Sequence, residues 1–161
     1  MTRRAIAKVA TTAVAGVLLA GGVTVATPGT ALAARSDCER GANGFRDIPD
    51  NQTGVAAGPA DKVLRPSDPQ GLVGRIGLGA ARIDGDVYGF AALAVPRVGD
   101  EIWMDWTLDG NSVYIQCGPF KATRDGHQLT SAARVTDSNP NYRFRACGGG
   151  GGQAVQCTDW W

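Results

Sequence analysis

Four cysteines constrain this chain more than any other feature, because two of them enclose a run of five glycines near the C-terminus. Cys147 and Cys157 flank Gly148 to Gly152, and the sequence then ends in Thr-Asp-Trp-Trp. Two large apolar indoles are seldom left on a frayed end, because water disfavours their surface. We therefore expect a final strand that a disulfide fixes to its neighbour, with indoles that pack or meet a ligand. The glycine run is expected to form a flexible loop inside that disulfide.

The first thirty-three residues have the pattern of an export signal. A basic start contains Arg3 and Arg4, an apolar stretch of small residues follows, and Ala31-Leu32-Ala33 matches the small-x-small cleavage pattern. The arginine pair also resembles a twin-arginine signal, but we expect the general secretory route, with cleavage after Ala33. The mature chain would then be secreted, run for 128 residues from Ala34, and hold no stretch long and apolar enough for a membrane span.

All four cysteines lie in the mature part, and an even number in a short exported chain predicts two disulfides. Four cysteines allow three pairings, and the residues alone do not choose among them; we favour Cys147–Cys157 with Cys38–Cys117. A zinc site is not expected, because no CxxC or CxxH spacing is present. With the leader removed, thirteen basic residues face fifteen acidic ones without a basic block, which argues against nucleic acid as a partner.

The mature chain divides by composition into two parts. Residues 34–70 are rich in glycine and proline and show no periodic pattern, so we expect an irregular N-terminal arm tied down by Cys38. Residues 71–161 alternate turn signals such as Asp84-Gly85 with apolar runs of strand length, which predicts one all-β domain. The expected fold is an antiparallel β-sandwich or a small barrel. The candidate strands are 72–78, 86–95, 100–107, 112–117, 128–135, 141–147 and 153–160.

The predicted strand 100–107 carries apolar bulk on both of its faces. Ile102, Met104 and Trp106 fall on one face, and Trp103 and Asp105 fall on the other. This pattern indicates a central strand with one face in the core and the other covered or binding a ligand. The alternative, that both tryptophans only pack, stays open.

The segment Thr107 to Tyr114 resembles the Asp-box hairpin of sialidases and other secreted β proteins. Asp109 and Tyr114 match that motif, Asn111 stands where glycine is usual, and Val113 replaces threonine. In that family the box stabilises the fold away from the active site. The resemblance therefore implies a capped turn and gives no reason to expect sialidase activity.

A wider resemblance covers about residues 95–161. Val98 to Asp105, Asp109-Gly110, Arg145 to Gly148 and Cys157 to Trp160 occur in the order seen in a small β module of secreted actinobacterial proteins. That module is sometimes found ahead of α-mannanase-type glycoside hydrolase domains. The resemblance implies an accessory module without activity of its own, and it favours the two late cysteines as a disulfide unit. The chain departs from the pattern at Trp106, where a basic residue is common.

Few residues could carry catalysis. His127 is the one histidine and lies in a polar turn beside Asp125, but no Gly-x-Ser-x-Gly elbow accompanies it. A glycoside hydrolase needs paired carboxylates, and most carboxylates here fall in turns, with Asp105 the exception between two tryptophans. Asp84-Gly85-Asp86 lacks the ligands of a calcium loop. We expect no enzymatic activity, no cofactor and no metal.

Aromatic surface is the remaining chemistry. Indole faces pack well against the C–H-rich faces of sugar rings, so five side chains could form a stacking platform unless they fill the core: Trp103, Trp106, Tyr114, Trp160 and Trp161. The residues expected to touch a ligand are Trp103, Asp105, Trp106 and Trp161. We expect a secreted, non-catalytic β module with weak binding to an extracellular glycan or the cell wall. The alternatives are a protein-binding role, such as a protease inhibitor, and a small glycoside hydrolase.

Overall fold

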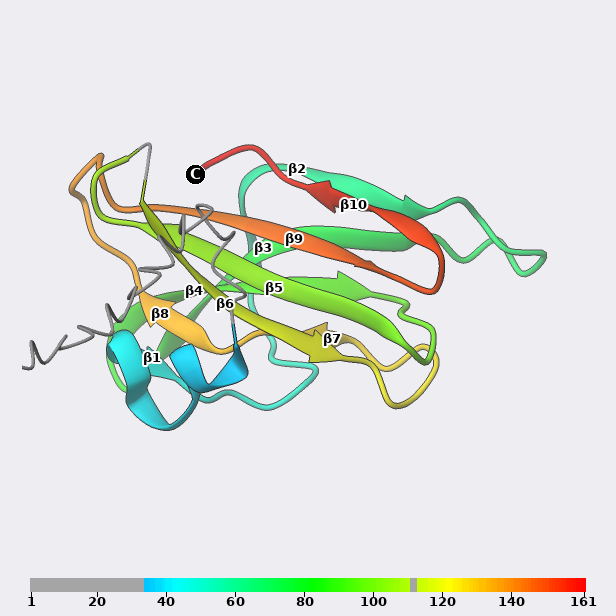
Figure 1. Cartoon of the computed structure of the whole chain (residues 1–161), viewed down its shortest axis with the longest axis horizontal. Coiled ribbons are helices and arrows are strands. Elements are labelled where there is room, and N and C mark those ends of the chain that lie inside the picture. The colour runs from blue at the N-terminus through cyan, green and yellow to red at the C-terminus, as the bar shows by residue number, and fades with distance from the viewer. Residues whose placement is uncertain (1–33, 111–112) are drawn as a thin grey trace, which may run out of the picture. The chain divides into compact units, whose positions relative to one another are not determined.

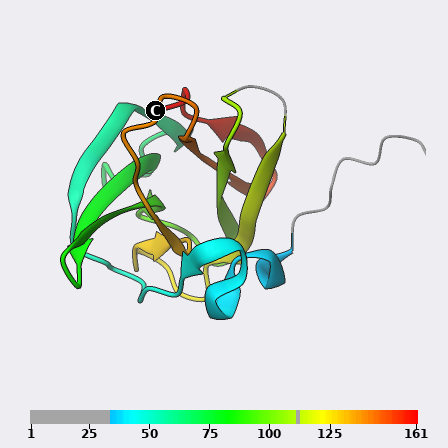
Figure 2. The same cartoon turned by 90° about the vertical axis from the view of Figure 1, so that its left-hand side faces the viewer.

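The computed structural model describes residues 34–110 and 113–161, and the predicted export signal lies outside them (Figure 1). The described chain forms two antiparallel sheets in a sandwich-like arrangement (Figure 2), which confirms the all-β class. In these two ranges no helix has the length and apolar character needed to cross a membrane.

The first sheet has six strands and contains one tight hairpin. Asp84 and Gly85 connect two neighbouring strands of this sheet, residues 74–83 and 86–94, with φ values of 49° and 100°, as a two-residue hairpin turn of this kind requires. The strands follow in the order β1 (Phe45–Arg46), β8 (Ala133–Val135), β4 (Asp86–Ala94), β3 (Gly74–Ile83) and β2 (Val55–Arg65), and β7 (Leu129–Thr130) also pairs with β4.

The second sheet has four strands, in the order β10 (Gln153–Cys157), β9 (Arg143–Gly150), β5 (Asp100–Thr107) and β6 (Tyr114–Lys121). The central strand β5 pairs with β9 over its whole length without a register shift. Successive side chains of β5 therefore alternate strictly between the core and the outer face of this sheet.

The core lies between the two sheets. Ile76 and Leu93 of the first sheet and Ile102 and Met104 of the second are completely buried in it. At the edge of this layer Arg65 of β2 donates to Asp100 Oδ2 of β5 at 2.6 Å, and both residues are buried. This charged hydrogen bond links the two sheets directly.

Residues 34–70 differ from the expected irregular arm. They begin with two short 3-10 segments, η1 (Arg35–Asp37) and η2 (Glu39–Gly44), but residues 55–65 form the edge strand β2. Gly58 and Pro59 hide this strand in the sequence, because both residues disfavour a regular ladder. The structure accommodates them in a bulge: Ala57 pairs with Leu78 and Lys62 with Ile76, so residues 58–61 lie opposite one residue of β3.

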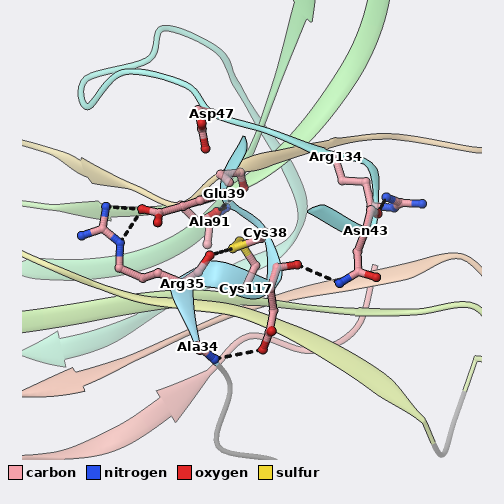
Figure 3. The surroundings of a disulfide bond; sticks show 12 residues. Ala34, Arg35, Cys38, Glu39, Asn43, Asp47, Ala91, Cys117 and Arg134 are labelled. Carbon is pink, nitrogen blue, oxygen red and sulfur yellow. Dashed lines mark hydrogen bonds and ion pairs between the residues drawn. A yellow bond between two sulfur atoms is a disulfide. The ribbon is translucent and has the colours of Figure 1, made fainter. Parts of the chain in front are cut away.

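Both favoured disulfides are present. Cys38–Cys117 ties the segment between η1 and η2 to β6 (Figure 3), and Cys147–Cys157 joins two residues that face each other on β9 and β10. Two disulfides of this kind indicate an oxidising environment.

The glycine run is not the flexible loop that the sequence suggested. Gly148 to Gly150 are the last residues of β9, and the turn to β10 consists of Gly151 and Gly152. A β-carbon at position 148 would lie 2.7 Å from Ile76 Cδ1 of the facing sheet. Glycine is therefore used here for close approach between the sheets.

Candidate functional site

The sequence predicts that Trp106 touches a ligand. In the structure its side chain lies in the core. Its side chain is 3% exposed. The Phe45 ring meets it edge-on with 6.1 Å between centroids, and the Arg134 guanidinium carbon lies 3.6 Å from the centre of its ring. The indole thus has no free face to offer.

Asp105 lies on the outer face of β5 as alternation predicts, yet it is only 1% exposed. Arg145 Nε of β9 donates to Asp105 Oδ2 at 2.7 Å, and Oδ1 has no hydrogen-bond partner in the described part of the chain. Burial raises the pKa of Asp105, and the hydrogen bond and charge of Arg145 oppose that effect. The expectation that Asp105 touches a ligand is therefore corrected: it acts within the sheet.

Two aromatic rings lie beside the arginine that pairs with Asp105. Tyr114 of β6 and Trp160 of the C-terminal segment lie on the outer face, with 6.0 Å between their ring centroids. The Arg145 guanidinium carbon lies 4.6 Å from the Trp160 ring centre and 5.3 Å from that of Tyr114. The rings thus flank the guanidinium that pairs with Asp105.

In the hairpin that resembles an Asp-box, Thr107 and Asp109 are hydrogen-bonded to each other. The Thr107 hydroxyl donates to Asp109 Oδ1 at 2.6 Å, and the Asp109 N–H donates to Thr107 Oγ1 at 3.2 Å. The Tyr114 ring packs against the Arg145 guanidinium, and the residue is 44% exposed.

Trp103 is half-buried on the same outer face. Its indole extends from β5 over β9 toward Gly149, where a β-carbon would lie 3.9 Å from Trp103 Cη2. Val155 of β10 borders Gly149 from the other side and is exposed. Trp103 therefore remains available for contact with a ligand.

Trp161 lies at the edge of the sandwich, away from Trp103. Its N–H and C=O both pair with Phe144 at 2.9 Å, so the chain beyond β10 continues alongside β9. The indole packs against Gly58 of β2 and, in a tilted arrangement, against the Phe144 ring. It is nevertheless 42% exposed.

The exposed part of Trp161 borders a cavity of about 410 Å³. Residues 136–140 and 142–144 form the remainder of its lining. This volume falls in the usual range for small-molecule sites. An aromatic side chain and a polar loop thus line the same cavity.

The polar loop at this cavity is held in place by its own hydrogen bonds. Asp137 Oδ1 accepts from the Asn139 N–H at 2.7 Å, and Asn139 Oδ1 accepts from the Asn141 N–H at 3.0 Å. Arg143 Nε donates to the Pro140 carbonyl at 2.9 Å. Within the described residues, the Ser138 hydroxyl, the Asn139 amide N–H₂ and the terminal guanidinium nitrogens of Arg143 have no side-chain hydrogen bond, so they remain free to bind a ligand.

A second cavity, of about 310 Å³, adjoins the Cys38–Cys117 disulfide (Figure 3). Its charged groups already bond within the protein. Arg35 pairs with Glu39 at 2.5 Å, and the Arg40 N–H donates to Asp47 Oδ2 at 3.1 Å. This cavity therefore offers a ligand fewer free groups than the cavity at Trp161.

Among the described residues, the side chain that hydrogen-bonds to the His127 ring is that of Asn51, whose amide donates to it. The Ser131 hydroxyl lies elsewhere, bonded to the backbone of Ala91 and Ala132. Among the described residues, no three His, Cys, Asp or Glu side chains gather in a way that could hold a metal ion.

Sequence reasoning missed the polar loop of the Trp161 cavity. The run Asp137-Ser138-Asn139-Pro140-Asn141 is a dense turn signal, and it could have been noted as a site of free polar groups. Its position beside Trp161 depends on the pairing of the C-terminal segment with Phe144, which no local pattern reveals.

Comparison with models of known protein families found no match, and searches of curated proteins and of solved structures found no similar chain either. The resemblance to an accessory module of secreted actinobacterial proteins therefore stays a prediction.

Proposed function

We propose that this protein is a secreted, non-catalytic module that binds an extracellular glycan in the cavity at Trp161. The observation that carries the proposal is the cavity itself, where Trp161, a residue that is 42% exposed, stands beside a loop with free polar groups. Sugars combine C–H-rich faces with hydroxyl groups, so an aromatic wall and a few fixed hydrogen-bonding groups suit them. The two disulfides support an extracellular location.

Hydrolysis is not proposed for this cavity. Most glycosidases place two carboxyl groups on either side of the scissile bond. Among the described residues that line the cavity, Asp137 is the one acid, and its Oδ1 is occupied by the Asn139 N–H.

An inhibitor role is not proposed either. Between Cys147 and Cys157 the chain forms a β-hairpin whose turn is made of glycines. Such a turn presents no side chain that could enter a protease pocket, and protease inhibitors derive their affinity from a preorganised binding loop.

The proposal is tested by titration calorimetry of the purified protein with soluble cello-, chito-, manno- and xylo-oligosaccharides. We expect binding to one of these series, and we expect Trp161→Ala to weaken it about tenfold or more, because the stacking wall is lost. Ser138→Ala removes one free hydroxyl and should weaken binding by a smaller factor. Val113→Ala, an exposed position outside the cavity, is the matched control and should bind like the unaltered protein.

Trp161 also packs against β2, so its replacement could disturb folding. Trp161→Phe keeps an aromatic ring at that place, and the thermal unfolding of each variant is followed by circular dichroism. The proposal is wrong if the unaltered protein binds none of the oligosaccharides, or if folded Trp161→Ala and Ser138→Ala both bind with undiminished affinity.

A further inference from the structure

The outer face of the four-stranded sheet carries a group of apolar side chains that the cavity does not use. We call it the outer-face cluster, and it consists of Trp103, Tyr114, Val155 and Trp160 around Arg145. Tyr114 and Val155 are exposed, and the two tryptophans are half-buried. Apolar side chains that gather on the surface of a small protein commonly mark a binding site.

The cluster follows the direction of β5. Trp103 faces Cys147 across the strands, and Asp105, two residues further on, faces Arg145, over which Tyr114 and Trp160 meet. Two residues of a strand advance about 7 Å. The Trp103 indole, however, reaches Gly149, which pairs with Glu101, four residues of β5 before Asp105. The aromatic groups at the two ends of the cluster therefore lie about 13 Å apart along the strand, so a ligand that touches both must be an extended chain.

The cluster carries no net charge. The one cation within it, Arg145, is compensated by Asp105 at 2.7 Å. Glu101, further along β5, is paired with Lys121 at 3.6 Å. Within the cluster itself the charges are therefore compensated, whereas Arg143 at the cavity forms no ion pair with a described residue. The cluster thus gives no electrostatic attraction for an acidic polysaccharide and suits a neutral one.

The cluster adjoins the Trp161 cavity along two segments, the C-terminal residues 160–161 and strand β9. Trp160 belongs to the cluster, and the next residue lines the cavity. Arg143 lines the cavity and precedes Arg145 by two residues on β9, so both side chains lie on the same face of the strand. A chain of sugars that leaves the cavity at Arg143 would meet the cluster next.

We propose that the outer-face cluster is a second subsite, which binds a neutral polysaccharide chain made of pyranose units. The inference rests on the proposed glycan-binding function and names its ligand class: an extended chain in place of an isolated short sugar. The cavity holds a short stretch of the chain, and the cluster stacks on neighbouring rings. Two linked contacts bind an extended ligand more tightly than either contact alone.

The test compares insoluble and short soluble probes with the same purified variants. Microcrystalline cellulose and insoluble chitin report on both subsites in a depletion assay, and di- and trisaccharides of the same sugars report on the cavity by calorimetry. Trp103→Ala/Tyr114→Ala should bind the insoluble probe about tenfold more weakly and the short sugars unchanged. Trp161→Ala should weaken both, and Val113→Ala should change neither.

Tyr114→Ala alone and Trp103→Phe are included as variants that disturb packing less, with circular dichroism as the folding control. An intermediate loss of binding to the insoluble probe in folded Tyr114→Ala supports the subsite. The inference is overturned if the double variant binds the insoluble probe as well as the unaltered protein while Trp161→Ala still loses the short sugars. If the unaltered protein binds neither probe, the proposed function fails together with it.

Discussion

At the scale of single residues, Asp105 shows how a charged group becomes buried outside the core. Alternation along β5 directs its side chain outward, yet it is 1% exposed, and Tyr114 and Trp160 flank the arginine that pairs with it. Arg145 supplies the compensating charge from a strand forty residues further along the chain. The sequence predicts the face on which Asp105 lies. It does not predict the pair with Arg145 or the rings that flank it, because these contacts depend on the register of three strands and on the C-terminal segment.

The raised pKa of Asp105 leads to a prediction about pH. Folding favours its protonated form, so ionisation of this carboxyl costs the folded state free energy that the unfolded chain does not lose. That cost disappears as the pH falls through the raised pKa toward the ordinary value of 3.8. The free energy of unfolding of the protein, minus that of Asp105→Asn, should therefore increase as the pH falls from about 7 to about 4. Urea unfolding of both proteins across this range measures the difference, and a difference that stays flat or decreases would contradict the account.

At the scale of elements, β9 shows why a run of glycines can be a strand. Gly148 allows Ile76 of the facing sheet to approach, and Gly149 leaves space for Trp103 and Val155 on the outer face. Glycine has low strand propensity, which is why the sequence indicated a loop. Pairing with β5 on one side and β10 on the other overrides that preference.

Alanine substitutions at positions 148 and 149 distinguish the glycine that the core requires from the glycine that lies on the outer face. A β-carbon at position 148 would lie 2.7 Å from Ile76 Cδ1 and 2.9 Å from the Glu101 carbonyl, so Gly148→Ala should lower the free energy of unfolding by about 1–3 kcal/mol. At position 149 the nearest atom would be Val155 Cγ2 at 3.2 Å, on an exposed side chain that can move. Gly149→Ala is therefore the matched control, with an expected change of about 0.5 kcal/mol or less. Equal effects in denaturant unfolding would argue against close approach as the reason for glycine at 148.

At the scale of the whole molecule, the sequence predicts what depends on local pattern. The strand expected at 100–107 is found at those residues, and the turn at Asp84-Gly85 and both disulfides are present as favoured. β2 escaped prediction because its bulge is stabilised by pairing with β3, and the predicted strand 128–135 is divided into β7 and β8. The candidate site depends on where Trp161 lies relative to residues 136–143, a contact set by pairing between distant segments.

The two disulfides should differ in what they contribute to global stability. Cys38–Cys117 joins residues 79 positions apart and Cys147–Cys157 residues 10 positions apart, so the first restricts the unfolded chain more. The chain-entropy relation gives about 4 kcal/mol for the first bond and about 3 kcal/mol for the second. Replacing each pair by alanine and measuring denaturant unfolding tests the order. A larger loss from the Cys147–Cys157 pair would show that native-state effects outweigh loop length.

Because the tryptophans lie in different surroundings, their fluorescence can report on different parts of the molecule. Trp106 is enclosed in the core, whereas Trp161 stands at the mouth of the cavity. Indole emission responds to the polarity of its surroundings, so the two positions would report different events. A variant that keeps only Trp106 would register loss of the core, and one that keeps only Trp161 would register occupation of the cavity in the folded state. Ligand binding and unfolding could then be followed as separate spectral signals in the same solution.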